Sequence, residues 1–119
     1  MGMIYAIFKV KKSYQDSDFI DVKFLIDSGS VYSLVPAKEL DKMGIVPHRT
    51  MKFVLADGTE LNRRVGDAYF EWHGEGGAAP VIFGEEGDES LLGTTTLESL
   101  GLVLNPFKRE LKPMRMLLM

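Results

Sequence analysis

The sequence contains no cysteine. Disulfide bonds, thiolate metal sites and a cysteine nucleophile are therefore excluded. Because disulfides are typical of oxidising compartments, their absence fits a reducing one, and we expect a cytoplasmic protein. The first residues, Met1 to Lys12, lack the basic, apolar and small-residue regions of a secretory signal, so we expect no such signal there.

Histidine is almost as scarce, with only His48 and His73 in the chain. Neither has a neighbour of ligand type at metal spacing, so we expect no metal site and no cofactor. Counting alone leaves serine–histidine catalysis possible, but the chain has no Gly-x-Ser-x-Gly elbow.

Neither a large charge excess nor a long apolar run is present. The formal net charge is −3, which gives no general attraction to nucleic acid or to an anionic membrane. No apolar run approaches the length of a membrane span. With 119 residues, 45% of them hydrophobic and 26% charged, the chain has the size and composition of one globular domain, residues 1–119, in which 113–119 could form an apolar tail.

The most informative stretch is an alternating apolar run that ends in a carboxylate. Hydrophobic residues recur at every second position from Ile20 to Ile26, which predicts a strand with one buried face. Asp27, Ser28 and Gly29 follow at once, and they form the Asp-Ser/Thr-Gly signature of aspartic proteases. The residues by themselves also fit a strand that ends in an ordinary polar turn, because all three are common in turns.

The rest of the chain predicts a mainly β domain with two short helices. A charged stretch, 85–89, is expected to be a solvated loop, and threonines at 94–96 are expected to cap the second helix. Ala56-Asp57-Gly58 between two strand-like runs predicts a tight hairpin. The expected strands are 3–10, 19–26, 32–35, 50–55, 59–65, 67–73, 78–83, 102–104 and 109–112, and the expected helices are 37–43 and 94–100.

A second motif makes the pattern specific. Leu91-Leu92-Gly93 directly precedes the second helix, far downstream of Asp27-Ser28-Gly29. This pair of motifs, with a hairpin between them, resembles the retropepsin-like aspartic proteases, the single-lobed group that includes the retroviral enzymes. The resemblance covers about residues 20–112 and implies a closed-barrel-like β lobe. It also implies a homodimer, since each lobe of that family brings one aspartate and catalysis needs two.

The resemblance assigns roles only where the motifs match. Asp27 would be the catalytic carboxylate, with its partner supplied by an identical subunit, and the substrate would be a peptide or protein. The supporting residues implied by the same match are Ser28, Gly29, Ser30, Leu91, Leu92 and Gly93. The hairpin residues Ala56, Asp57 and Gly58 stand where the family has its flap, although an ordinary tight turn without substrate contact is the alternative.

Two departures from the viral pattern occur together. Thr94 stands where those enzymes have an arginine, and Val31 stands where they have its acidic partner, so a dimer has to be secured differently. Trp72 and Phe70 are expected in the core or in a substrate wall, and Tyr32 in a pocket wall or at the surface.

Three functions are compatible with this sequence: a dimeric aspartic endopeptidase, a non-catalytic protease-fold module that binds extended peptides, and a structural or regulatory subunit that forms no aspartate pair. The complete motif around Asp27 favours the first of these, because a pure binder has no physical need for that carboxylate.

Overall fold

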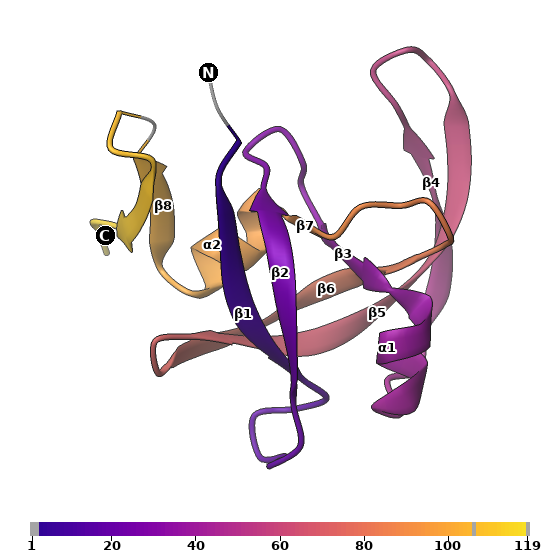
Figure 1. Ribbon diagram of the computed structural model, residues 1–119, viewed down its shortest axis with the longest axis horizontal. Helices are drawn as coiled ribbons and strands as arrows, with labels where there is room; N and C mark the ends of the chain where they lie inside the picture. Colours follow the sequence, from indigo (N-terminus) through magenta and orange to yellow (C-terminus); the bar gives the residue numbers. More distant parts are fainter. Residues whose placement is uncertain (1–2, 106, 119) are drawn as a thin grey trace.

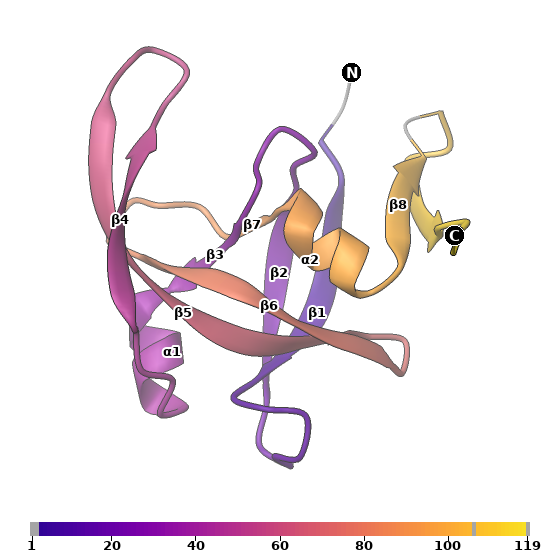
Figure 2. The same cartoon turned by 180° about the vertical axis from the view of Figure 1, so that it is seen from behind.

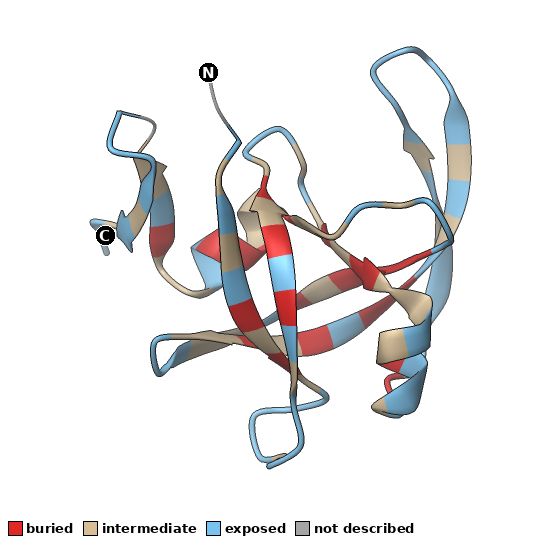
Figure 3. Cartoon of the chain, viewed as in Figure 1, coloured by how far each residue is buried: buried red, intermediate tan, exposed pale blue. Residues whose placement is uncertain are grey.

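The strand predicted before Asp27 is present, and its residues alternate between buried and more exposed positions as the sequence predicts. The computed structural model describes residues 3–105 and 107–118. In β2 (Ile20–Ile26), Val22, Phe24 and Ile26 are buried while the residues between them are exposed or half-buried. Phe24 packs edge-on against Phe8 of β1 (Tyr5–Lys11), and the buried residues of both strands, red in Figure 3, belong to one core.

The remaining elements follow the expected order with shifted ends. The strands are β3 (Ser33–Pro36), β4 (Arg49–Val54), β5 (Glu60–Trp72), β6 (Glu75–Gly84), β7 (Leu91–Leu92), β8 (Leu102–Asn105) and β9 (Glu110–Pro113), and the helices are α1 (Ala37–Lys42) and α2 (Thr94–Ser99) (Figure 1). Within the described ranges, no helix has the length and apolar character needed to cross a membrane.

The strands form a nearly closed barrel. The main sheet has seven strands in the order β1-β2-β7-β3-β6-β5-β4, and β1 also pairs with β5. This extra pairing closes the ring, so that β4 alone is left outside it, paired to β5. Closure pairs the strands of the ring on both sides and encloses one continuous core, while β4 keeps a free edge. The predicted mainly β, closed-barrel-like class with two short helices is confirmed.

Two predicted strands turn out to be one. The sequence suggested a break between 59–65 and 67–73, but β5 runs unbroken through Gly66, which pairs with Val81 of β6. A side chain at Gly66 would lie 3.1 Å from the carbonyl oxygen of Val46, so this glycine marks a close backbone approach rather than a turn. Strand β6 also begins earlier than the predicted strand 78–83, at Glu75, so the turn between β5 and β6 is short.

The predicted threonine cap of α2 is wrong. The residue at the N-cap position is Gly93, and no side chain caps the helix there. The first helical N–H groups instead donate to loop carbonyls, Thr94 to Ser30 at 2.8 Å and Thr95 to Val31 at 3.0 Å. Unpaired N–H groups at a helix start need such acceptors, so α2 and the loop after Asp27 stabilise one another.

The carboxyl-terminal part lies beside the barrel. Strands β8 and β9 form a separate two-stranded sheet, which follows α2 on the side of the molecule away from the β4–β5 hairpin (Figure 2). Beyond β9, residues 114–118 have no regular secondary structure and include the exposed Met116, Leu117 and Leu118. Met119, the last residue of the predicted apolar tail, lies outside the described residues, and so does Pro106, between the predicted strands 102–104 and 109–112.

Candidate active site

Asp27 lies at the start of the loop between β2 and β3, and its backbone is fixed from two sides. Its N–H donates to the carbonyl oxygen of Leu92 at 3.0 Å, which continues the parallel pairing of β2 with β7. Its carbonyl accepts the N–H of Ser30 at 3.1 Å, and its Oδ1 accepts the N–H of Gly29 at 2.9 Å. The carboxylate is therefore oriented by its own loop and remains partly exposed.

The two sequence motifs meet in space. Leu92 is fully buried beneath the Asp27 loop, and Leu91 pairs with both β2 and β3. Gly93 packs so closely that a side chain there would lie 2.7 Å from backbone atoms of Val31 and Tyr32. Only glycine allows this approach, so Gly93 lets the turn before α2 pack directly against the loop that follows Asp27.

The other three predicted supporting residues, Ser28, Gly29 and Ser30, lie in the loop itself. The hydroxyl of Ser30 is half-buried and donates to the carbonyl of Tyr32 at 2.9 Å. Ser28 is exposed at the turn, beside the exposed Gly29.

A buried hydroxyl pair that the sequence analysis did not single out completes the support. Ser33 and Thr96 are both fully buried, and their hydroxyl oxygens lie 2.5 Å apart. Ser33 Oγ also accepts the N–H of Gly93 at 2.9 Å. The available signal was a serine at an inward position of β3, two residues before the buried Val35, where an apolar residue is the usual choice.

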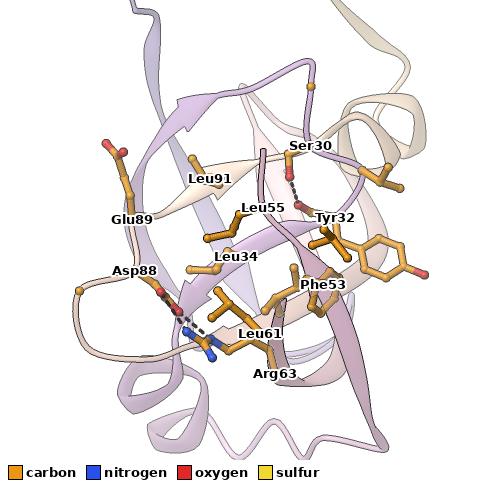
Figure 4. A pocket seen from close by; sticks show the side chains of 15 residues that line it. Ser30, Tyr32, Leu34, Phe53, Leu55, Leu61, Arg63, Asp88, Glu89 and Leu91 are labelled. Carbon is orange, nitrogen blue, oxygen red and sulfur yellow. Dashed lines mark hydrogen bonds and ion pairs between the residues drawn. The ribbon is translucent and has the colours of Figure 1, made fainter. Parts of the chain in front are cut away.

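A cleft of about 480 Å³ opens beside the loop (Figure 4). One wall is the loop from Gly29 to Tyr32, and the opposite wall is the start of the hairpin, Phe53 to Leu55, with Leu61. The Tyr32 and Phe53 rings lie 6.4 Å apart in an edge-on arrangement, so Tyr32 contributes to a pocket wall. Apolar residues form most of the lining: Val31, Tyr32, Leu34, Phe53, Val54, Leu55, Leu61, Ile82 and Leu91.

The predicted hairpin is present, and its tip lies beyond the cleft. Ala56, Asp57 and Gly58 are exposed and do not line the cleft, whose hairpin side is formed by residues nearer the barrel. Gly58 has a φ of 89° and its N–H donates to Leu55, which is the geometry of a short hairpin loop closed by glycine. A hydrogen bond from Thr59 lowers the pKa of the Asp57 carboxyl, so this tip carries a negative charge.

The acidic loop is not fully solvated as predicted. Asp88 is turned inward, with its side chain only 19% exposed, and it lines the cleft beside Arg63 of β5. The hydrogen bond from Arg63 is the main cause that lowers the pKa of Asp88. Glu85, Glu86 and Glu89 of the same loop are exposed. The prediction failed at Asp88 because its partner arginine comes from a distant strand.

At the other end of β5, Phe70 belongs to the core and the half-buried Trp72 packs against it. Phe70 is fully buried, and Trp72 stacks on Phe8 with ring centroids 5.9 Å apart. Neither lines the cleft next to Asp27. Among the residues that the structure describes, no three His, Asp or Glu side chains lie close enough together to hold a metal ion.

The comparisons with known proteins show a likeness to solved structures. No family model matches the sequence, and no curated protein does. Among solved structures, the fold is similar to the crystal structure of a retropepsin-like aspartic protease from Rickettsia conorii. The match covers 87% of this chain and 92% of that one, with 19% sequence identity and a TM-score of 0.44. At this level of identity the likeness concerns the fold alone.

Proposed function

We propose that the protein is an aspartic endopeptidase that acts as a homodimer. The observation that carries this proposal is the setting of Asp27: its backbone is bonded to Leu92, its carboxylate is held by Gly29, and an apolar cleft begins at the next residues. A carboxylate in a tight turn next to a peptide-sized cleft suits hydrolysis of an extended chain.

The chemistry requires a second carboxylate. The chain has a single Asp-Ser-Gly, so the second aspartate would be Asp27 of an identical subunit related by a two-fold axis. The exposed Ser28 and the exposed Val31 leave this loop accessible to such a partner.

Two carboxylates in contact cannot both ionise cheaply, so they share one proton, as in aspartic proteases generally. The ionised carboxylate takes a proton from a water molecule, which attacks the peptide carbonyl carbon, while the protonated carboxyl donates to the carbonyl oxygen. The resulting tetrahedral species loses its amine after proton transfer to nitrogen, and no acyl-enzyme forms. The two apparent pKa values belong to the pair and not to either residue.

Asp27→Asn tests the proposal directly. We expect the variant to lose hydrolysis of peptides across acidic to neutral pH while remaining folded and dimeric. The substitution replaces both carboxylates of the homodimer, so the unfavourable contact between them is removed and the dimer should be at least as stable as that of the wild type. Sedimentation at micromolar concentration gives the oligomeric state of the same samples. Hydrolysis that survives in Asp27→Asn, or full activity in a strictly monomeric wild type, would contradict the proposal.

The second candidate is a module that binds extended peptides without cutting them. It is favoured by one specific feature: β4 pairs with β5 alone and stands at the free edge of the sheet, where a peptide strand could add. This candidate predicts peptide binding that is equal in wild type and Asp27→Asn, with no cleavage by either. Binding measurements on both proteins therefore separate the two functions.

A further inference from the structure

One charged pair lies at the apolar cleft, and it joins two elements that are far apart in the sequence. Arg63 Nε donates to Asp88 Oδ2 at 2.9 Å, and Arg63 Nη2 donates to Asp88 Oδ1 at 3.3 Å (Figure 4). Both side chains are largely buried, with 14% of Arg63 and 19% of Asp88 exposed. A two-pronged pair with little exposure fixes geometry far better than a surface ion pair does.

The same carboxylate also fixes the turn that carries it. Asp88 Oδ2 accepts the N–H of Glu85 at 2.8 Å, and the N–H of Asp88 donates to the carbonyl of Glu85 at 2.9 Å. Gly87 supplies the positive φ of 91° that this turn requires. Asp88 thus fixes the conformation of the turn at residues 85–88, and Arg63 holds this turn against β5.

Arg63 is the cation that offsets a concentrated negative charge. Four of the five residues from Glu85 to Glu89 are acidic, and Arg63 Nη1 also lies 3.7 Å from Glu85 Oε2. Without this guanidinium, the four carboxylates repel one another and Asp88 loses its partner. The turn would then move away from β5 and into water.

The turn forms part of the cleft lining, through Gly87, Asp88 and Glu89. Leu61, two residues before Arg63 on β5, lines the hairpin side, and Leu91, shortly after Asp88, lines the opposite side. The pair therefore joins one wall of the cleft to the other. A change in the distance between Arg63 and Asp88 alters the space between the apolar walls and leaves Asp27 in place.

We propose that the Arg63–Asp88 pair determines specificity, by holding the cleft at a width that selects a large apolar side chain of the peptide. Arg63 and Asp88 act here as positioning residues, since neither is assigned contact with the reacting atoms. The inference rests on the proposed peptidase function, because it concerns the substrate that the same site accepts.

The test uses peptides that differ only in one residue next to the cleaved bond, with Ala, Leu or Phe at that position. In the wild type we expect kcat/KM to rise from Ala to Phe. In Arg63→Gln this Phe-to-Ala ratio should fall by about tenfold or more, through KM and not through kcat, because the pocket walls separate while the aspartate pair is intact. Asp88→Asn should lower the ratio less, since it removes one acidic group from the crowded turn. Arg63→Lys should restore part of the ratio by keeping the positive charge.

Arg64→Gln is the matched control. Arg64 is the next residue of β5, it lies over the ring of Phe83 at 5.0 Å, and it does not line the cleft. The same substitution there should leave the Phe-to-Ala ratio unchanged. Hydrogen exchange supplies a readout that needs no substrate: the N–H groups of Glu85 and Asp88 should exchange faster in Arg63→Gln and at the wild-type rate in Arg64→Gln.

Each outcome decides the inference separately from the proposed function. Faster exchange together with a lower ratio supports it. Unchanged exchange overturns it, and so does an unchanged Phe-to-Ala ratio in a folded Arg63→Gln enzyme that still cleaves.

If the wild type cleaves no peptide, the peptidase proposal fails, and the Phe-to-Ala ratio is then measured as binding of the same peptides. A binding ratio lowered by Arg63→Gln supports the inference, whereas an unchanged ratio or absence of binding overturns it. If Arg63→Gln does not fold, Asp88→Asn and Arg63→Lys give the same decision.

Discussion

Ser33 and Thr96 share a buried hydrogen bond across 63 positions of sequence, with their hydroxyl oxygens 2.5 Å apart. The same serine oxygen accepts the N–H of Gly93, the last residue of the second motif. Two hydroxyls and one amide therefore connect β3, the turn before α2 and α2 itself directly behind the Asp27 loop. Each polar group in this set has its partner inside the protein, which is the condition for burying it at low cost.

Removal of Ser33 Oγ should destabilise the protein. Ser33→Ala leaves the Gly93 N–H and the Thr96 hydroxyl without their partner, so we expect the free energy of unfolding to fall by about 1–3 kcal/mol. Thr96→Val should cost less, because Ser33 still accepts from Gly93. Urea unfolding of the two single variants and the double variant measures the coupling. Losses that simply add in the double variant would mean that the two hydroxyls act independently.

Gly93→Ala should move the Asp27 loop. The new methyl group would lie 2.7 Å from backbone atoms of Val31 and Tyr32, which cannot give way as a flexible side chain can. We expect a loss of about 1–3 kcal/mol in stability, together with a fall in peptide hydrolysis. Gly74→Ala is the control: Gly74 has a φ of 82° with open space around it, so its strain of about 1–2 kcal/mol should leave hydrolysis intact. Equal effects of both changes on hydrolysis would show that close packing at Gly93 is unimportant.

Gly58→Val should affect turnover if the 56–58 tip closes over a bound peptide. Gly58 has a φ of 89°, and no atom lies within 4 Å of the position that a Cβ would take there, so the substitution strains the turn without a clash. We expect kcat/KM to fall while the dimer persists, because the Asp27 loop is elsewhere. Gly74→Val places the same strain in the β5–β6 hairpin and should leave kinetics unchanged. Kinetic constants equal to the wild type in a folded Gly58→Val protein would show that the hairpin is no flap.

The Arg63–Asp88 pair should contribute to stability in a defined pH range. The hydrogen bond from Arg63 lowers the pKa of Asp88 in the folded protein, so the folded state favours the ionised carboxylate. The contribution is therefore fully present above the ordinary pKa of an aspartate and is lost as the pH falls through the lowered value. Urea unfolding of wild type and Asp88→Asn from neutral to strongly acidic pH should show a difference that is constant near neutrality and shrinks in acid. A difference that grows as the pH falls would contradict this assignment.

Local pattern was enough to predict most of the elements, including the strand that ends at Asp27. The period-two alternation before Asp27 predicted β2 and its buried face, because neighbouring side chains of a strand point to opposite sides. Ala56-Asp57-Gly58 predicted a hairpin turn for an equally local reason, since glycine tolerates the positive φ that closes it. The meeting of Asp27 with 91–93 was foreseen only through the resemblance to a family.

Tertiary structure decided the features that depend on which strands become neighbours. The β5 strand continues through Gly66 because β6 pairs along its whole length, and the first N–H groups of α2 bond to the Asp27 loop because β7 places that helix beside it. In the sequence, Arg63 and Asp88 resemble ordinary surface charges. The fold brings them into contact by placing the loop before β7 beside β5. Composition and periodicity determine the secondary structure of each segment and which of its faces is apolar. Pairing between strands that are far apart in the sequence depends on sheet register and barrel closure, which are properties of the whole chain.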